Sequence, residues 1–278
     1  MKTVTLNGQS VAAIGMGSWH LGQGRHSEAA EINALRAGID SGLRVIDTAE
    51  MYGDGRSESL IGKAIDGLRD RVYLVSKIYP YHANRLLMER SCNASLKRLN
   101  TDCLDLYLLH WRFSSVLSEA VSGFEKLKQQ GKIKAWGVSN FDVDDMEDLF
   151  AVEQGDRCVT NQVFYNPASR GIEFDLIPWC NQHHMPMMAY SPLGGEGASL
   201  LRHPLITQLA AKYQTGPSTV LLAWVIRNGN MIAIPESGEA AHIKENAAAL
   251  SVQLQPADLR VMDEAFPPPT RKMPLETR

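Results

Sequence analysis

Three apolar, strand-like runs in this chain each end at a titratable residue of a different type. The runs and the residues that follow them are Leu43–Ile46 with Asp47, Val72–Ser76 with Lys77, and Leu104–Leu109 with His110. Side chains at the carboxyl ends of parallel barrel strands face one shared mouth, so these three groups are expected to meet there. Tyr52 follows Asp47 by five residues in a glycine-containing loop and is expected to join them.

Together the four side chains could protonate a carbonyl oxygen. A free phenol has a pKa of about 10, too high for easy donation at neutral pH. A Lys77 ammonium would favour the phenolate and lower that pKa, while Asp47 would keep the lysine charged. His110 could then hold a substrate oxygen by a hydrogen bond. Taken singly, an Asp or Lys at a strand end is more often a cap or an ion pair, but the set of four favours carbonyl reduction.

The hydride for such a reduction would have to come from a cofactor. Gly-x-Ser-x-Gly is absent, and Cys103 stands before a strand rather than at its end, so no side chain is an evident nucleophile. Gly15-Met16-Gly17 lacks the third glycine and the directly following helix of a Rossmann fingerprint. Any dinucleotide is therefore expected to bind in another way.

Composition excludes several classes of protein. The 278 residues are 44% hydrophobic, with a formal net charge of -3 and no basic run, which argues against nucleic acid and anionic membranes as partners. No apolar stretch approaches the roughly 18 residues of a membrane span, and no signal peptide is evident. The four cysteines lack Cys-x-x-Cys spacing, which favours free thiols in the cytoplasm. The adjacent His183 and His184 lack further ligands, so no metal site is expected.

Strand-like and helical segments alternate along the whole chain. Ser27 and Asp142 are candidate helix caps, and the last helix is expected at His242–Leu250. The pattern predicts a (β/α)8 TIM barrel as a single domain over residues 1–278. The eight candidate strands are Ile14–Gly17, Arg44–Ile46, Val72–Ser76, Leu104–Leu109, Lys134–Val138, Val159–Val163, Met187–Tyr190 and Met231–Ile234.

Both ends of the chain fall outside this alternation. Val4–Leu6 and Val11–Ile14 flank Asn7-Gly8, which predicts an N-terminal β-hairpin that acts as a lid over one end of the barrel. Three prolines at 267–269 cannot continue a helix, so Thr270–Arg278 is expected to be an irregular C-terminal tail.

Several ordered motifs resemble the aldo-keto reductase family. They are Val45–Gly53 with Ser57, Glu58 and Gly62 beyond, Ser76-Lys77, Leu106–Trp111, Gly137–Phe141, Asn161–Val163, Tyr190–Leu193 and Ile232–Pro235. Each is weak alone, but together they follow the family's order over nearly the whole chain. Within the family, the chain most resembles bacterial methylglyoxal-reducing members.

The resemblance implies a barrel that binds NADPH across its carboxyl-terminal mouth and reduces small aldehydes and α-dicarbonyls. It assigns the catalytic roles to Asp47, Tyr52, Lys77 and His110, with Tyr52 as the acid. The positions it assigns to the cofactor are Ser139, Asn140 and Gln162 for the nicotinamide amide, Tyr190 for stacking on its ring, Ser191 and Leu193 for the diphosphate, and Ile234, Glu236, Ser237, His242, Glu245 and Asn246 after the last strand. The substrate pocket would be walled by Trp19, His20, Trp111 and Phe113.

One departure from the family pattern concerns the cofactor. Relatives that prefer NADPH carry Lys where Glu236 stands and Arg where His242 stands, and both cations hold the 2′-phosphate. A carboxylate about 4 Å from that phosphate would cost on the order of 1 to 4 kcal/mol. A weakened preference for NADP(H), with NAD(H) as an alternative, is therefore expected. If Glu236 instead turns to solvent, Ser237 and His242 could still hold the phosphate.

Two other functions on the same barrel compete with the reductase. Some family members are cofactor-sensing regulatory subunits with slow turnover, but no additional N-terminal segment favours that reading here. An aldolase or isomerase is disfavoured because no phosphate-binding glycine loop is evident. The expected partner is a small carbonyl substrate, and the expected assembly is a monomer or weak homo-oligomer.

Overall fold

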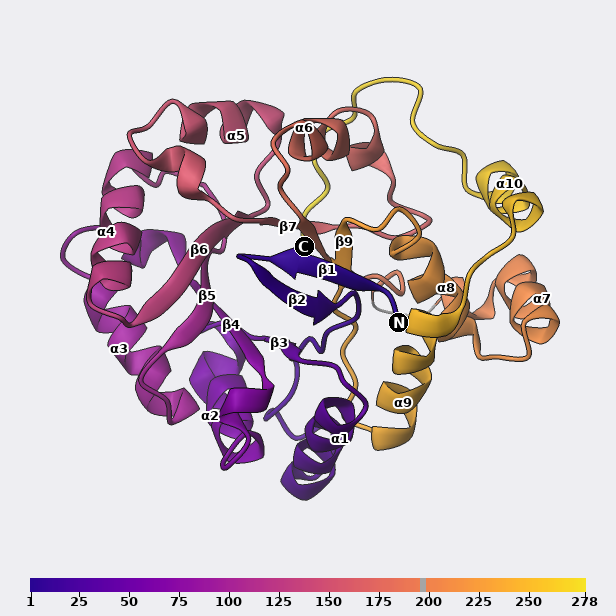
Figure 1. Cartoon of the computed structure of the whole chain (residues 1–278), viewed down its shortest axis with the longest axis horizontal. Coiled ribbons are helices and arrows are strands. Elements are labelled where there is room, and N and C mark those ends of the chain that lie inside the picture. Colours follow the sequence, from indigo (N-terminus) through magenta and orange to yellow (C-terminus); the bar gives the residue numbers. More distant parts are fainter. Residues whose placement is uncertain (196–198) are drawn as a thin grey trace.

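A ring of parallel strands surrounded by helices forms the body of the protein (Figure 1). The computed structural model describes residues 1–195 and 199–278. The strands are β1 (Thr3–Leu6), β2 (Gln9–Ala12), β3 (Val45–Asp47), β4 (Tyr73–Ile78), β5 (Leu104–Leu109), β6 (Ile133–Ser139), β7 (Asn161–Phe164), β8 (Met187–Tyr190) and β9 (Met231–Ala233). From β3 to β9 each strand pairs in parallel with the next in sequence, which is the order of a (β/α)8 barrel.

Residues 13–17 close the ring between its first and last strands. Ile14 bridges Ala233 of β9 and Met16 bridges Ile46 of β3, both in parallel. The amide of Gly15 donates to the carbonyl of Ala233 at 2.8 Å, and the amide of Met16 donates to that of Val45 at 2.9 Å. The segment expected as the first barrel strand therefore occupies that position, although it forms isolated bridges instead of a regular strand. The predicted TIM barrel is confirmed.

Helices cover the outside of the strands, which explains why the strand sequences are almost continuously apolar. Every residue of β4 and β5 is buried, because the barrel interior covers one face and helices cover the other. The helices are α1 (Glu28–Asp40), α2 (Arg56–Ala64), α3 (Met88–Leu99), α4 (Leu117–Gln129), α5 (Val143–Phe150), α6 (Leu176–Gln182), α7 (Pro204–Lys212), α8 (Pro217–Val225), α9 (Ala240–Ala248) and α10 (Pro256–Ala265).

Two helix starts follow the predicted caps. The Ser27 hydroxyl accepts a hydrogen bond from the Ala30 amide at 3.2 Å at the start of α1. Asp142 begins α5 in a capping box with Asp145: the Asp145 carboxylate accepts from the Asp142 amide at 3.0 Å, and the Asp142 carboxylate accepts from the Val143 amide at 2.8 Å. The expectation that the last helix lies at His242–Leu250 is wrong, because α10 follows it. A proline at its first position and buried Asp258 and Met262 favour this additional helix.

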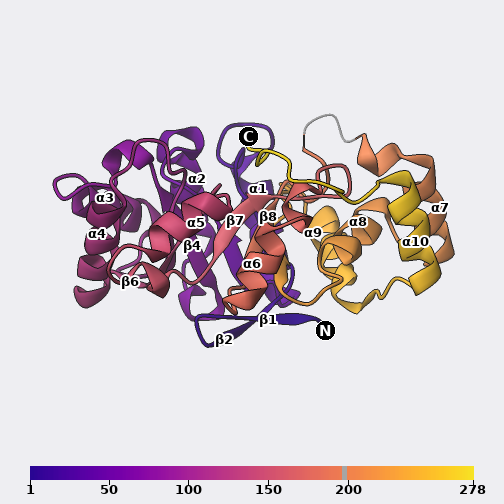
Figure 2. The same cartoon turned by 90° about the horizontal axis from the view of Figure 1, so that it is seen from above.

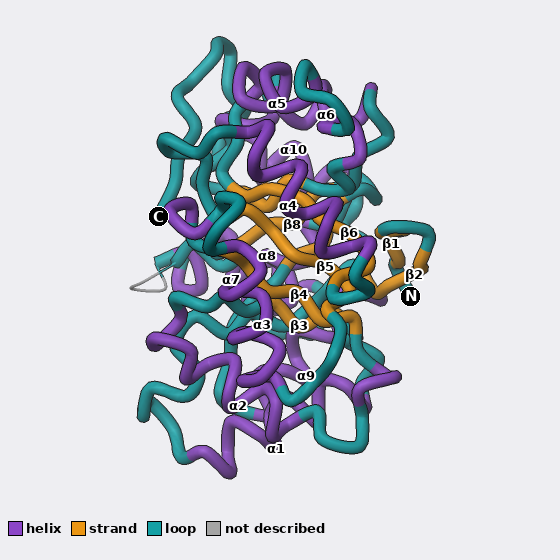
Figure 3. Tube along the Cα trace, turned by 90° about the vertical axis from the view of Figure 1, so that its left-hand side faces the viewer, coloured by secondary structure: helices purple, strands orange, loops and turns teal. Residues whose placement is uncertain are grey.

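The hairpin and the C-terminal tail lie at opposite ends of the barrel (Figures 2 and 3). β1 and β2 pair antiparallel around Asn7-Gly8, and both turn residues have positive φ, as a tight hairpin turn requires. The predicted lid is confirmed at the amino end of the strands. The predicted irregular tail, Thr270–Arg278, is also confirmed, and it returns to the carboxyl end, where Arg278 lines a cavity.

Candidate active site

Four titratable side chains converge at the carboxyl ends of neighbouring strands. Asp47 ends β3, Lys77 stands one residue before the end of β4, and His110 directly follows β5. The Lys77 ammonium lies 2.6 Å from Oδ2 of Asp47 and 3.0 Å from the hydroxyl of Tyr52. Its third hydrogen bond goes to the Thr48 carbonyl at 2.9 Å. All three donor positions of the ammonium are therefore used, and its direction is fixed.

A sharp turn after β3 brings Tyr52 over the lysine. Residues Tyr52–Gly55 form a short 3-10 turn in which Gly53 and Gly55 have φ of 57° and 86°. A Cβ on Gly55 would come within 2.5 Å of the Arg98 side chain, so this position needs glycine for both space and conformation. The glycines seen in the sequence thus serve to fold the loop back and place the phenol at the strand ends.

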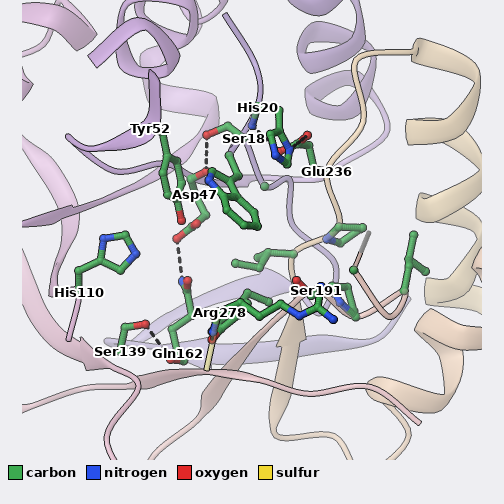
Figure 4. Close-up of a pocket in the computed structure, with 18 of the residues that line it drawn as sticks. Ser18, His20, Asp47, Tyr52, His110, Ser139, Gln162, Ser191, Glu236 and Arg278 are labelled. Atoms are coloured by element: carbon green, nitrogen blue, oxygen red, sulfur yellow. Dashed lines mark hydrogen bonds and ion pairs between the residues drawn. The ribbon is translucent and has the colours of Figure 1, made fainter. Parts of the chain in front are cut away.

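Both the carboxylate and the backbone carbonyl of Asp47 accept hydrogen bonds. Its Oδ1 accepts from Nε2 of Gln162 at 2.7 Å, and its backbone carbonyl accepts from the Ser18 hydroxyl at 2.8 Å. Figure 4 shows the carboxylate between Tyr52 and Gln162. Gln162, which the family resemblance assigns to the cofactor amide, therefore also positions the ion pair.

Burial dominates the electrostatics of the Asp47–Lys77 pair. Burial raises the pKa of Asp47 and lowers the pKa of Lys77, while the attraction between the two charges opposes both shifts. Lys77 is 0% exposed and Asp47 is 2% exposed, so neither charge is solvated by bulk water. The pair is stable only when both members are present.

The expectation that Lys77 lowers the pKa of Tyr52 is wrong for this structure. Burial, followed by the carboxylates of Asp47 and Glu236, raises the pKa of the Tyr52 phenol well above 10. The phenol therefore carries its proton at neutral pH, as a proton donor must. The adjacent ammonium remains in place to stabilise the phenolate that donation produces.

His110 is neutral at physiological pH. Burial, and then repulsion from Lys77, lowers its pKa well below 6.5. Its ring stacks on Trp111 at a centroid distance of 3.9 Å and meets the Tyr52 ring edge-on at 5.7 Å. Among the described residues no group hydrogen-bonds its buried Nδ1. A neutral imidazole can donate one hydrogen bond to an oxygen held beside the phenol.

A cavity of about 380 Å³ opens beside these groups. Most residues that the sequence assigned to catalysis, cofactor or substrate line it. They are Trp19, His20, Asp47, Tyr52, His110, Trp111, Ser139, Asn140, Gln162, Tyr190, Ser191, Leu193, Ile234 and Glu236.

The remaining assigned residues lie elsewhere. Lys77 is fully buried beneath the cavity wall. Phe113 is 58% exposed and stacks on Trp111 from outside. Ser237 and His242 line a second, adjoining cavity, whereas Glu245 pairs with the Ser218 hydroxyl at 2.5 Å. Asn246 is buried within α9 and lines neither of the two cavities.

Two basic residues that the sequence analysis did not select also line the first cavity. Arg25 does so from the loop before α1, in which Gly22 and Gly24 have positive φ and indicate turns. Arg278 does so from the tail, and its amide donates to the Tyr190 hydroxyl at 3.1 Å. No local pattern identifies Arg278, because its place depends on the path of the whole tail.

Glu236 binds the neighbouring loop. Its Oε2 accepts from the His20 amide at 2.8 Å, and its Oε1 lies 3.0 Å from Nδ1 of His20. Its side chain is 25% exposed. The carboxylate is therefore not turned wholly to solvent, and it is bound to the loop that carries His20.

The cavity suits an elongated polar cofactor. Near Tyr52 and His110 its wall carries the hydroxyl of Ser139 and the amide groups of Asn140 and Gln162. Farther along, His20, Arg25 and Glu236 line both this cavity and a separate one that adjoins it. In the described part of the chain, no group of three or more His, Cys, Asp or Glu could hold a metal ion. No helix of residues 1–195 or 199–278 is long and apolar enough to cross a membrane.

Comparison with known proteins gives consistent matches over the whole chain. The Aldo/keto reductase family profile matches residues 13–266. The methylglyoxal reductase YeaE of Escherichia coli is 47% identical over 279 residues, which cover 99% of this chain and 98% of that protein. The glyoxal reductase of Bacillus subtilis is 31% identical over 92% of this chain and 90% of its own.

Solved structures agree with the sequence matches. The crystal structure of an aldo/keto reductase from Klebsiella pneumoniae, in complex with NADP and acetate, superposes with a TM-score of 0.97. It is 50% identical and the match covers 100% of this chain and 99% of that one. The ordered motifs found in the sequence thus coincide with similarity over the full length.

Proposed function

The chain belongs to the aldo/keto reductase family, and we propose that it reduces small aldehydes and α-dicarbonyls with NADPH, using Tyr52 as the proton donor. The observation that carries this proposal is the contact of Tyr52 with the buried Lys77–Asp47 pair at the wall of the cavity. It supplies an acid that is protonated at neutral pH together with a cation that stabilises its conjugate base.

The substrate class follows from the relatives and from the size of the site. Similar proteins from Escherichia coli and Bacillus subtilis are named for methylglyoxal and glyoxal. The cavity of about 380 Å³ must hold the nicotinamide end of the cofactor as well as the substrate. The space left favours short carbonyl compounds, with Trp19, His20 and Trp111 as walls.

The proposed reaction adds a hydride to the carbonyl carbon and a proton to its oxygen. When bound, the nicotinamide supplies the hydride. Tyr52 donates its phenolic proton to the oxygen, and the resulting phenolate is stabilised by the ammonium of Lys77. Asp47 balances that ammonium before and after the transfer. Solvent returns the proton to Tyr52, so the product is an alcohol and the enzyme is restored.

His110 would position the oxygen that receives the proton. Because burial keeps its imidazole neutral, one ring nitrogen can donate a hydrogen bond without competing with Lys77 for Asp47. The edge-on contact with the Tyr52 ring places that donor beside the phenol. An oxygen held by both groups would have a fixed distance from the acid.

We assign the cofactor to the residues along the cavity. Ser139, Asn140 and Gln162 would hold the nicotinamide amide and Tyr190 would stack on its ring. Toward the other end, the contacts would come from Ser191, Leu193 and Ile234 in the first cavity and from Ser237 and His242 in the adjoining one, whereas Glu245 and Asn246 line neither cavity. Support comes from the described hydrogen bonds among the first group, such as Tyr190 to Asn140 at 2.8 Å, which preset the wall.

Two finer statements belong to the same proposal. All four cysteines are free, and three of them are buried. Free thiols are typical of a reducing compartment, which supports a cytoplasmic location. We also propose a monomer or weak homo-oligomer, because the side chains of Asp47, Lys77, Tyr52 and His110 contact one another within a single chain.

The test is NADPH oxidation with methylglyoxal, compared between the wild type and Tyr52→Phe. Loss of the phenolic proton should lower kcat by about 10²- to 10⁴-fold. Tyr81→Phe, which makes the same chemical change at a side chain that is 62% exposed, should keep the wild-type rate. If Tyr52→Phe retains full kcat, the acid is another group.

A further inference from the structure

A buried carboxylate that the proposed reaction does not use lies close to the turn that carries Tyr52. Glu58 stands in the first turn of α2 and is fully buried. Its Oε2 accepts a hydrogen bond from Nε of Arg98 at 2.6 Å, and its Oε1 accepts one from the Ser76 hydroxyl at 2.6 Å. Both carboxylate oxygens are therefore bound, which fixes the position of the side chain.

Ser76 joins this carboxylate to the strand that carries Lys77. The two residues are neighbours in β4, so their side chains point to opposite faces of the strand. Lys77 faces the barrel interior, where it contacts Asp47, whereas Ser76 faces α2, where it donates to Glu58. The start of α2 is thus bound to the same strand that positions the ammonium.

Arg98 connects Glu58 with the turn itself. It stands in the last turn of α3, and its side chain lies against Gly55, where an added Cβ would meet Cδ of Arg98 at 2.5 Å and Nε at 2.6 Å. Its Nε donates to Glu58, and its Nη2 donates to the Ser95 hydroxyl at 3.2 Å. Two acceptors therefore hold the arginine side chain against the turn.

The turn needs such support because its backbone is unfavourable. Three consecutive residues, Gly53, Asp54 and Gly55, have positive φ of 57°, 54° and 86°. Conformations of this kind persist where surrounding contacts hold them, and they concentrate at functional sites. The stem of Arg98 packs against the last of the three residues, so it limits how far the turn can relax.

We propose that Glu58 and Arg98 are positioning residues for the proton donor, and that they hold the turn so that the Tyr52 phenol stays beside the Lys77 ammonium. This inference rests on the proposed role of Tyr52. The two atoms are 3.0 Å apart, and a displacement of about 1 Å would break their hydrogen bond. A misplacement of that size can slow a reaction roughly 10²-fold.

The pair should act on the rate and not on binding. Neither Glu58 nor Arg98 lines either of the two described cavities, so neither is placed to touch substrate or cofactor. Their opposite charges are 2.6 Å apart and largely cancel at a distance, so geometry and not charge should be their contribution. Loss of the pair should therefore lower kcat and leave KM nearly unchanged.

The first test measures kcat and KM with NADPH and methylglyoxal. Arg98→Ala should lower kcat by about 10- to 10²-fold and change either KM by less than about twofold. Glu58→Gln removes the charge but can still accept from Arg98 and donate to the Ser76 hydroxyl, so it should keep most of the wild-type kcat. A loss in Glu58→Gln as large as in Arg98→Ala would overturn the positional role.

The matched control is another arginine bound to a buried glutamate. Nη1 of Arg157 lies 2.6 Å from Oε2 of Glu125, whose side chain is 8% exposed. Arg157→Ala also leaves a buried carboxylate without its cation, but Arg157 precedes β7, at the amino end of the strands, and should keep the wild-type kcat. If Arg98→Ala does not fold, Arg98→Met replaces it, because methionine keeps most of the stem but neither hydrogen bond, and its kcat should fall in the same direction.

A double-mutant cycle shows whether the pair acts through Tyr52. In the Tyr52→Phe background the phenolic proton is already absent, so Arg98→Ala should lower the single-turnover rate no further. The same fold-loss in both backgrounds would mean that Arg98 acts on another step, and the proposal would be wrong.

Amide hydrogen exchange tests the turn without any turnover. The amides of Tyr52 and Asp54 donate to the carbonyls of Ala49 and Met51 at 3.1 and 3.2 Å. Their exchange should be about tenfold faster in Arg98→Ala and unchanged in Arg157→Ala. Unchanged exchange in Arg98→Ala would overturn the proposal.

These measurements separate the positioning proposal from the proposed function. If Tyr52→Phe keeps full kcat, the acid assignment fails, and faster exchange in Arg98→Ala still supports a pair that holds the turn. If Tyr52→Phe abolishes reduction while Arg98→Ala keeps the wild-type kcat, the proposed function stands and the positioning role fails.

Discussion

The two ends of the barrel are built on opposite principles. At the amino end, the β1–β2 hairpin covers the strands with buried apolar side chains, among them Val4, Leu6 and Val11. At the carboxyl end, Asp47 and Lys77 are equally buried, yet both are ionisable. The same ring of strands therefore closes one end with hydrophobic contacts and holds charged groups at the other.

This difference separates stability from function along the barrel axis. Apolar closure removes hydrocarbon from water and needs no polar partner, so each residue adds to stability. Buried charges lose their hydration, and their mutual attraction at best balances that loss. The carboxyl end thus carries charged groups that serve the reaction. Apolar packing at the amino end contributes stability that offsets the cost of burying them.

Removing one member of the charged pair should produce the largest effect. In Lys77→Met the Asp47 carboxylate stays buried without its cation, and the free energy of unfolding should fall by about 3 to 5 kcal/mol. Reduction of methylglyoxal should be lost as well, because nothing stabilises the Tyr52 phenolate. Urea denaturation and NADPH oxidation measure the two effects on the same preparation.

The matched controls are a double variant and a surface lysine. Asp47→Asn with Lys77→Met removes both charges and should recover part of the stability but none of the activity. Lys63→Met breaks an exposed pair with Glu28, in which Lys63 is 57% exposed, and should change stability by less than about 1 kcal/mol. A double variant as unstable as Lys77→Met would mean that charge burial is not the cause.

A substitution in the hairpin should affect stability alone. Leu6 is 0% exposed, and Leu6→Ala should lower the free energy of unfolding by about 3 kcal/mol through lost burial and a cavity. Activity at 25 °C should stay near that of the wild type, because the hairpin lies at the far end from Tyr52. Thr5→Ala, on the exposed face of the same strand, is the control and should leave both quantities nearly unchanged. A drop in kcat for Leu6→Ala in folded protein would show that the two ends are coupled.

The sequence predicts the carboxyl end well because strand ends are local features. Asp47, Lys77 and His110 each terminate an apolar run, and parallel pairing of neighbours in sequence brings those ends together. The closing segment at Ile14–Gly17 was also recognisable from its apolar run. Contacts between distant segments were not predictable in this way. The hydrogen bond from the His20 amide to Glu236 joins residues 216 positions apart. The carboxylate that the sequence placed beside the cofactor is thus bound to a distant loop of the protein.

The pKa values show the same limit. A neighbouring ammonium suggested a lowered pKa for Tyr52, yet the depth of burial, which no motif reveals, raises it. The additional helix α10 was missed for a related reason. Its apolar side is short, with Met262 as its one fully buried hydrophobic residue, so its periodicity is weak.

The smallest effect should appear in the pH dependence of stability. Burial and Lys77 lower the pKa of His110 well below 6.5, so the folded state leaves this imidazole neutral where the unfolded chain protonates it. Protons then favour unfolding, and stability contributed by His110 is present above pH 6.5 and lost as the pH falls below it. The slope from one such group is at most about 1.4 kcal/mol per pH unit.

Urea denaturation between pH 7.5 and 5.5 spans this change, and comparison with His110→Gln separates the contribution of His110 from that of the other seven histidines. His110→Gln should lose less stability than the wild type across the window, whereas His184→Asn should follow the wild type. Leu6→Ala should be less stable at every pH but have the wild-type slope, because the hairpin end holds no such group. An equal slope in His110→Gln would place the protonated group elsewhere. A changed slope in Leu6→Ala would mean that proton binding at the mouth depends on packing at the other end of the barrel.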